Sequence, residues 1–294
     1  MTQPLVGLIG GTGLGEALAG ELTGKSVEAD TPFGPPSGPI LMGRIDDQPI
    51  ALLARHGPGH MLPPTAVPSR ANIYALKKLG VTHIIASGAT GSLREDIHPR
   101  DLVICDQVID KTFARPSTFF DGFVGHVEFA DPFCNTLRRV LIETAEAAGV
   151  KVHTTGTYVC MEGPQFSTRA ESAMHRLWGG DLIGMTCMPE AKLAREAEIC
   201  YALVAMATDY DCWRPHDGTA DPKTLIAEII GHLKAATANA IRLIRAAVPR
   251  VAEADATPCP CQSALAMAIW SDRKRISPAA VEKLGPIVEK YFDV

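Results

Sequence analysis

The chain of 294 residues contains no apolar run long enough to cross a bilayer, and no long run of Lys and Arg. A spanning helix needs about 20 mostly apolar residues, so a membrane protein is not expected. The formal net charge of −5 and the lack of a basic face argue against nucleic acid as a partner. A secretion signal has a basic region before its apolar run, and the N-terminus lacks one before its short apolar run. We therefore expect a cytoplasmic protein.

Internal repeats and a regular cysteine framework are also lacking. The eight cysteines are spaced irregularly in a long chain, unlike those of a small secreted disulfide scaffold. Four lie in apolar surroundings and are expected to be ordinary buried thiols: Cys105, Cys160, Cys187 and Cys200. Cys259 and Cys261 flank one proline in a loop-like stretch, where they could pair with each other or with other cysteines, or stay reduced. A zinc site would need two further ligands, and none lies nearby in the sequence, so we expect no metal.

What the sequence does have is an alternation of short apolar runs and amphipathic segments. Short apolar runs predict strands at 5–9, 50–54, 83–87, 102–108, 157–160, 182–185 and 201–207. Apolar residues at three- and four-residue steps predict helices at 71–79, 135–148, 169–178, 190–199 and 225–248. The alternation predicts an α/β fold, a single-domain α/β/α sandwich around a central mixed β-sheet. We assign residues 1–249 to this domain and residues 250–294 to a C-terminal helical appendage.

Two carboxylates, Asp209 and Asp211, directly follow the apolar run 200–207. Residues two apart on a strand point the same way, so both could face one ligand at the strand's carboxyl end, where ligands of open α/β sheets collect. Carboxylates this close favour sharing a proton. A solvated turn with an Asx hydrogen bond would have the same spacing, and the pair alone does not separate the two interpretations.

Two glycine-containing segments resemble nucleotide-binding motifs but do not meet them. From Gly11 the sixth position is Glu16, so the dinucleotide fingerprint G-x-G-x-x-G fails. Residues 19–26 fit a relaxed Walker A pattern, but about ten residues separate them from the preceding strand, whereas a P-loop leaves its strand directly. A dinucleotide or nucleoside triphosphate is therefore not expected.

Several predicted strand ends instead carry groups that suit a simple anion. Glycines around Thr12 let backbone N–H groups converge on an anion. The guanidinium of Arg55, with His56 beside it, can bind an oxyanion bidentately. Small residues follow the strand at 83–87, and Thr186 follows the one at 182–185. Together with the Asp pair, these ends suggest a phosphate used alongside a ligand that carboxylates bind through hydrogen bonds.

Seven ordered motifs extend this interpretation. They are Gly10-Gly-Thr-Gly-Leu14, Asp30-Thr-Pro-Phe-Gly34-Pro-Pro-Ser37, Leu53-Ala-Arg-His-Gly57, Gly91-Ser-Leu-Arg-Glu95, Glu162-Gly-Pro-Gln-Phe166-Ser167, Met185-Thr186 with Pro189-Glu190, and Ala207-Thr-Asp-Tyr-Asp-Cys-Trp213. In these motifs the chain resembles the S-methyl-5′-thioadenosine phosphorylases, a family in the trimeric branch of the purine nucleoside phosphorylase superfamily. The resemblance runs from about residue 5 to about residue 248.

The resemblance implies phosphorolysis of methylthioadenosine to adenine and 5-methylthioribose 1-phosphate, with phosphate as co-substrate and no cofactor. It implies phosphate binding by Thr12, Arg55, His56, Gly88, Ala89 and Thr186. It implies substrate binding by Phe166, Ser167, Met185, Asp209, Tyr210 and Asp211, with an apolar wall formed by Pro222, Leu225 and Ile226. His126 matches a residue that a neighbouring subunit donates, so a homotrimer is expected, or a hexamer made of two trimers.

The resemblance and the chemistry together give Asp209 and Asp211 the catalytic role. A protonated Asp209 would supply a proton or a strong hydrogen bond to N7 of the leaving base. Carboxylates accept hydrogen bonds from a 6-amino group, whereas the amide donor of Asn suits a 6-oxo group. A 6-oxopurine or methylthioinosine phosphorylase and a non-catalytic nucleoside-binding protein remain as alternatives. The chain departs from the family pattern at Gly88, Gln165, Gly184 and Pro222. These departures leave open whether 5′-deoxyadenosine is also accepted.

Overall fold

The computed structural model describes residues 5–214, 221–254 and 259–292. Its strands form one sheet of eleven. They are β1 (Leu5–Gly10), β2 (Gly24–Val27), β3 (Ile40–Ile45), β4 (Gln48–Ala54), β5 (Val81–Ser92), β6 (Leu102–Ile104), β7 (Gln107–Asp110), β8 (Val152–His153), β9 (Thr157–Cys160), β10 (Leu182–Gly184) and β11 (Cys200–Tyr210). The α-helices are α1 (Leu14–Glu21), α2 (Ser69–Lys78), α3 (Asn135–Ala147), α4 (Arg169–Leu177), α5 (Cys187–Glu196), α6 (Pro222–Ala254) and α7 (Pro278–Leu284).

The sheet is mixed and divides at β5. Strand β1 runs parallel to β4 and β5, and β5 runs parallel to β11. The β2–β3–β4 edge is antiparallel. Beyond β5 the sheet continues in two branches, one through β10, β9 and β7, and one through β11, β6 and β8. The long strand β5 therefore pairs with both branches, with β10 in one and with β11 in the other.

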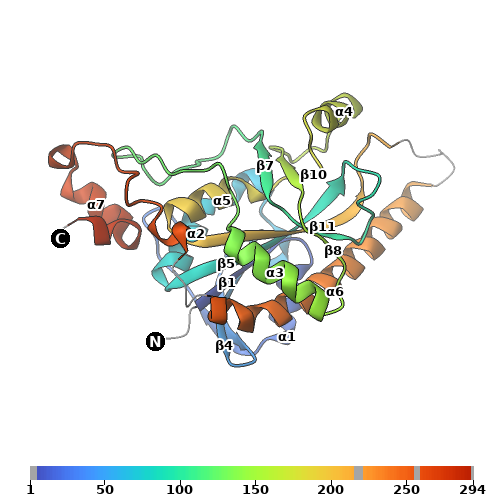
Figure 1. The fold of residues 1–294 in the computed structure, drawn as a ribbon, viewed down its shortest axis with the longest axis horizontal. Coiled ribbons are helices and arrows are strands. Elements are labelled where there is room, and N and C mark those ends of the chain that lie inside the picture. Colours follow the sequence, from blue (N-terminus) through green and yellow to red (C-terminus); the bar gives the residue numbers. More distant parts are fainter. Residues whose placement is uncertain (1–4, 215–220, 255–258, 293–294) are drawn as a thin grey trace.

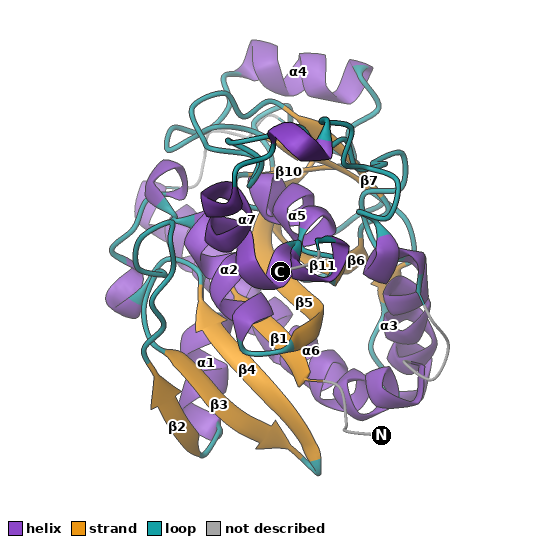
Figure 2. Ribbon diagram, turned by 90° about the vertical axis from the view of Figure 1, so that its left-hand side faces the viewer, coloured by secondary structure: helices purple, strands orange, loops and turns teal. Residues whose placement is uncertain are grey.

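Helices cover both faces of this sheet, as Figure 2 shows. Alternate residues of β11 point to opposite faces: Tyr201 and Leu203 join the core under α2 and α5, while Ala202 and Val204 join the core under α1, α3 and α6. A strand that is buried on both faces needs apolar residues at every position. The sequence of β11 is therefore an unbroken apolar run over residues 200–207. The predicted α/β fold with a central mixed sheet is confirmed.

The last described segment, residues 259–292, forms the tail of the chain. Helix α6 runs through Pro249 to Ala254 and so spans the boundary that the sequence predicted at 249/250. Leu265, Leu284 and Ile287 are buried in the same core as α2 and α5, so the tail shares a core with the sheet domain. In Figure 1 the tail with α7 lies beside the extended segment that follows β7, and together they form a projection from the body.

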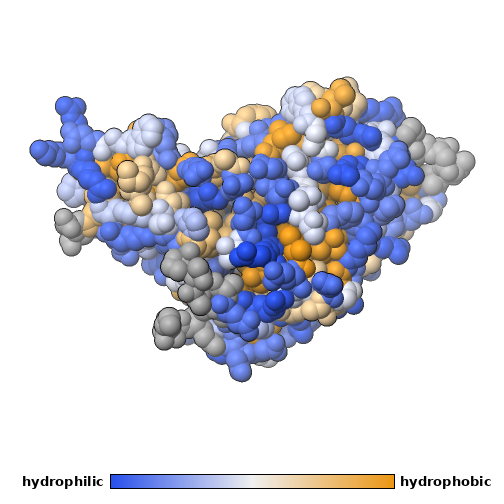
Figure 3. Space-filling model, in the orientation of Figure 1, coloured by the Kyte–Doolittle hydropathy of each residue, from blue (hydrophilic) through white to orange (hydrophobic). Residues whose placement is uncertain are grey.

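The surface of one face is mainly hydrophilic, with hydrophobic residues in smaller patches, as Figure 3 shows. Among the residues that the structure describes, no helix is both long enough and apolar enough to cross a membrane.

Candidate active site

A cavity of about 550 Å³ lies where the ends of β1, β4, β10 and β11 meet the middle of β5. Because β1, β4, β5 and β11 are parallel neighbours, their carboxyl ends reach the same edge of the sheet. The structure brings most of the predicted site residues together there: Thr12, Arg55, His56, Gly88, Ala89, Phe166, Ser167, Met185, Thr186, Asp209, Tyr210 and Asp211 all line the cavity.

The loop after β1 can enter this cavity only because it is built of glycine. A Cβ at Gly11 would lie 2.7 Å from the carbonyl oxygen of Ser87 and 2.8 Å from Nη1 of Arg55. Gly13 has a φ of +83°, a conformation that glycine adopts without strain. The glycines therefore let the backbone beside Thr12 approach β5 and Arg55 closely.

Arg55 is buried, and much of its hydrogen-bonding capacity is used inside the protein. Its Nε and Nη2 donate to the two carboxylate oxygens of Glu190 at 2.5 and 3.0 Å, and Nη1 donates to the carbonyl of Ser87 at 2.7 Å. Tyr201 donates to the same carboxylate at 2.9 Å. Burial alone would lower the pKa of Arg55, but the Glu190 carboxylate outweighs it and raises the pKa above its ordinary value. Of its five N–H groups, two remain for an anion in the cavity.

His56 faces the cavity as a neutral ring. Its Nδ1 donates to the carbonyl of Leu62 at 2.8 Å. Burial lowers the pKa of His56 to about 4, against a smaller opposite effect of the Leu62 hydrogen bond, and the Arg55 charge adds to the lowering. Because Nδ1 carries the proton, Nε2 is an acceptor at neutral pH. It suits the P–OH group of a hydrogen phosphate.

The two aspartates lie at the end of β11, where the pairing with β5 shifts register between Ala207 and Asp209. The Thr208 hydroxyl donates to Oδ1 of Asp209 at 2.6 Å. The backbone N–H of Asp211 donates to the carbonyl of Ser92 at 2.9 Å. Oδ2 of Asp211 is buried and has no hydrogen-bond partner within the described residues. Buried acceptors normally have a donor, so this oxygen is a natural contact for a ligand N–H group.

Arg115 supports the site and was not found from the sequence. Its guanidinium forms an ion pair with Glu162 at 3.0 Å and donates to the carbonyls of Met185 and Met188 at 2.6 and 2.7 Å. It therefore ties the long loop after β7 to two segments beside the cavity. The length of that loop was the only sequence signal, since no motif marks Arg115 itself.

Three of the described residues that were predicted for the site do not line the cavity. Leu225 and Ile226 of α6 do not line it, and the side chain of Pro222 lies outside the described part of the structure. Ile229 and Leu233 line it instead, one and two turns further along the helix from Leu225. The predicted apolar wall is therefore displaced along α6. His126 lines a second cavity of about 520 Å³ and does not line the first one.

Other lining residues carried no recognisable sequence signal. They include His60, Pro64 and Met161. Most are small or uncharged, and only folding brings them together.

Comparisons with known proteins agree with this architecture. A family model described as the phosphorylase superfamily matches residues 5–249. A curated S-methyl-5′-thioadenosine phosphorylase of Geobacter sulfurreducens is 49% identical over 292 residues, covering 98% of this chain and 99% of the relative. A crystal structure of methylthioadenosine phosphorylase from an antarctic soil metagenomic library is similar with a TM-score of 0.88 at 43% identity, covering 98% of this chain and 99% of that chain.

A structure of methylthioadenosine phosphorylase from Schistosoma mansoni in complex with tubercidin is also similar, with a TM-score of 0.82 at 32% identity, covering 91% of this chain and 99% of that chain. The fold and the site thus define a member of the phosphorylase superfamily of enzymes. Within that superfamily, the chain belongs to the S-methyl-5′-thioadenosine phosphorylase family.

Proposed function

We propose that this enzyme catalyses phosphorolysis of S-methyl-5′-thioadenosine, forming adenine and 5-methylthioribose 1-phosphate. The observation that carries the proposal is that one cavity is lined both by groups suited to phosphate, Arg55, Thr12 and Thr186, and by the carboxylates of Asp209 and Asp211. The names of the relatives support the same substrate.

The reaction breaks a glycosidic bond and passes through an oxocarbenium-like state. The charge of the phosphate stabilises the developing sugar cation, and its oxygen forms the new bond to the anomeric carbon. Arg55 is already paired with Glu190, so the pair adds little net charge at the site. We infer that phosphate is held mainly by neutral donors together with the two remaining N–H groups of Arg55, so its charge stays available to the reacting sugar.

The leaving adenine needs a proton or a strong hydrogen bond at N7. We assign this role to Asp209 in its protonated form, and acceptance of the 6-amino group to Asp211. The unpartnered Oδ2 of Asp211 supports the second assignment, because an exocyclic amine supplies the donor that it lacks. A 6-oxo group would present an acceptor to this carboxylate and be disfavoured.

The 5′ substituent would contact the apolar wall formed by Ile229 and Leu233. Since this wall is apolar, we extend the proposal to 5′-deoxyadenosine as a second substrate. We also propose a homotrimer in which His126 completes the 5′ pocket of a neighbouring subunit, with a hexamer of two trimers as the larger assembly. The cytoplasmic location stays a prediction.

One assay tests the reaction. The enzyme is incubated with methylthioadenosine, 5′-deoxyadenosine, adenosine or methylthioinosine, each with and without phosphate, and free base is measured. Adenine release only with phosphate is expected. Release without phosphate would mean a hydrolase, and no release from any substrate would mean a binding protein.

Two variants test the roles of the aspartates separately. In Asp209→Asn, turnover of methylthioadenosine should fall by about 100-fold or more, since general acid catalysis contributes on that scale. In Asp211→Asn, the ratio of methylthioinosine to methylthioadenosine turnover should rise, because the amide can donate to a 6-oxo group. Asp46→Asn, in the exposed turn between β3 and β4, is the matched control and should change neither quantity. An unchanged substrate ratio in Asp211→Asn would contradict the assignment.

A further inference from the structure

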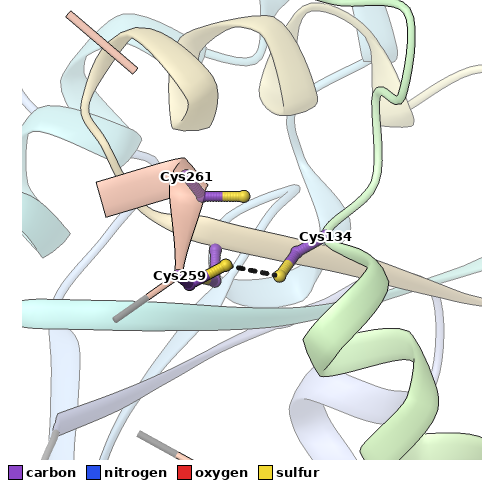
Figure 4. Close-up of side chains that lie close together, drawn as sticks. Cys134, Cys259 and Cys261 are labelled. Carbon is purple, nitrogen blue, oxygen red and sulfur yellow. Dashed lines mark hydrogen bonds between the residues drawn. The ribbon is translucent and has the colours of Figure 1, made fainter. Parts of the chain in front are cut away.

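Four cysteines that are distant in the sequence converge at one point outside the active-site cavity. Cys134 precedes α3, Cys200 begins β11, and Cys259 and Cys261 lie at the 3₁₀ helix Pro260–Ser263 of the tail. Their four sulfur atoms all lie within 4.8 Å of one another, and all four residues are buried. Figure 4 shows Cys134 and Cys259 pointing toward each other, with Cys261 on the adjoining turn.

The spacing of the sulfurs suits a shared ion. Cys134 and Cys259 have their sulfurs 3.5 Å apart, whereas a disulfide joins sulfurs at about 2.0 Å. A zinc ion bound by four thiolates at about 2.3 Å holds each pair of sulfurs about 3.8 Å apart. A compact group of four, rather than separate pairs, is the arrangement of a tetrahedral tetrathiolate site.

The surroundings of the cluster also favour thiolates that a cation holds. The four residues pack within the hydrophobic core beside α3 and α6. Thiols are weak hydrogen-bond donors and acceptors, so four of them together gain little from one another there. The backbone N–H of Leu137 donates to the sulfur of Cys134 at 3.4 Å. A helix N-terminus of this kind stabilises a thiolate.

We propose that Cys134, Cys200, Cys259 and Cys261 bind one zinc ion in a closed tetrathiolate site. Four protein ligands leave no open position for water or substrate, so the ion is structural and takes no part in the reaction. Binding would release the thiol protons as the four Zn–S bonds form. The second cavity, which Cys134, Cys259 and Cys261 line, is the path by which the ion enters.

This ion would fasten the tail to the segment that carries His126. Ala268, a few residues after Cys261, accepts a hydrogen bond from the backbone N–H of His126 at 2.9 Å, and Gly125 pairs with Ile269. The ion would therefore cross-link this part of the tail to the start of β11 and to α3. It would thereby stabilise the tail segment with which the backbone of His126 pairs.

The sequence did not indicate such a site, for two reasons. One residue separates Cys259 from Cys261, whereas paired zinc ligands are usually separated by two to four. The two further ligands, Cys200 and Cys134, lie 59 and 125 residues before Cys259 in the chain. Only the tertiary structure supplies the two further ligands that the Cys-Pro-Cys segment lacked.

Metal analysis of the full-length protein, purified without chelator, tests the proposal. We expect about one zinc per chain by inductively coupled plasma mass spectrometry. The double variant Cys259→Ser/Cys261→Ser should contain close to none. Cys105→Ser is the matched control, because this buried cysteine lies outside the cluster, and it should keep its zinc. Wild-type protein without zinc, or with iron in its place, would overturn the proposal even where the double variant fails to fold.

Thiol titration separates zinc from disulfides. In denaturant with a chelator and no reductant, a zinc site leaves all eight cysteines reactive. Six or fewer reactive thiols together with no metal would show disulfide pairing and overturn the proposal. Both readouts are independent of phosphorolysis, so a wrong substrate assignment and a wrong metal assignment can be told apart.

Discussion

At the scale of single residues, the contact between Arg55 and Glu190 sets the charge on one side of the cavity. Both side chains are only 1% exposed, and their charges cancel. Arg55 therefore acts as a donor fixed in place rather than as a free positive charge. The hydroxyl of Tyr201 also donates to the carboxylate of Glu190. The position of the Arg55 guanidinium therefore depends on residues far from it in the sequence.

Glu190→Gln should destabilise the protein by about 3–5 kcal/mol, because it leaves the buried guanidinium without a counter-charge. Denaturant unfolding measures this loss. Asp96→Asn removes the carboxylate of an exposed ion pair with Arg94 and should cost less than about 1 kcal/mol. Equal losses in the two variants would mean that burial of the Arg55 pair has no energetic consequence.

The lowered pKa of His56 predicts how the stability of the protein depends on pH. Its pKa in the folded protein is about 4, below the value of about 6.5 expected in the unfolded chain. The unfolded state therefore takes up a proton first, and stability is lost as the pH falls from about 6.5 toward 4. Between about pH 7.5 and pH 5 the wild type should lose about 2 kcal/mol more than His56→Gln, which has no titrating ring.

Urea unfolding of both proteins at several pH values checks this difference. Identical pH dependence would show that folding leaves the pKa of His56 unchanged, and would contradict this account.

At the scale of elements, β10 carries a departure from the family pattern that the structure explains. A Cβ at Gly184 would overlap the hydroxyl of Tyr158 on the neighbouring strand β9. Tyr158 is buried, and its hydroxyl accepts a hydrogen bond from the backbone N–H of Thr186 at 3.4 Å. The tyrosine thus occupies the space that a larger residue at position 184 would need.

Gly184→Ala should therefore destabilise the protein by about 1–3 kcal/mol, the usual range for overpacking. Adding Tyr158→Phe to it should restore part of the loss, because the overlapping hydroxyl is removed while the ring carbon stays close. Thermal unfolding of the two single variants and the double variant measures the coupling. Strictly additive effects would contradict this account.

Elements with strong periodicity were predicted closely. The predicted helices at 135–148 and 169–178 correspond to α3 and α4 almost to the residue, and the strand at 157–160 corresponds to β9. The predicted strand at 102–108 is two strands, β6 and β7, which join different branches of the sheet. Helix α1 and strands β2 and β3 were missed. Glycines interrupt α1, and β2 is largely exposed, so neither has a clear apolar period.

At the scale of the whole molecule, the projection formed by the tail and the loop after β7 exposes large apolar side chains. Phe113, Met267 and Trp270 are each more than 70% exposed, and the ring of Trp270 packs against His126. Exposed apolar groups of this size are typical of a surface that another chain covers. They support the proposed subunit interface at His126.

Subunit mixing tests that interface. His126→Ala should lower the rate with methylthioadenosine by about tenfold, the effect of one lost hydrogen bond, although His126 lies outside its own subunit's cavity. Co-expression of His126→Ala with Asp209→Ala should recover activity, because one chain supplies an intact cavity and the other supplies His126. Co-expression of His126→Ala with the double variant His126→Ala/Asp209→Ala is the control. No recovery in the first mixture would place His126 outside any shared site.

The sequence by itself determined the alternation of strands and helices and pointed to most of the residues that the structure brings to one cavity. Arg55 and Asp209 could be recognised because residue type and position at a strand end are local properties. The tertiary structure decided what those residues contact. The pairing of Arg55 with Glu190, the shift of the apolar wall to Ile229 and the convergence of four cysteines all join segments far apart in the chain, and such contacts follow from packing, which local sequence does not encode.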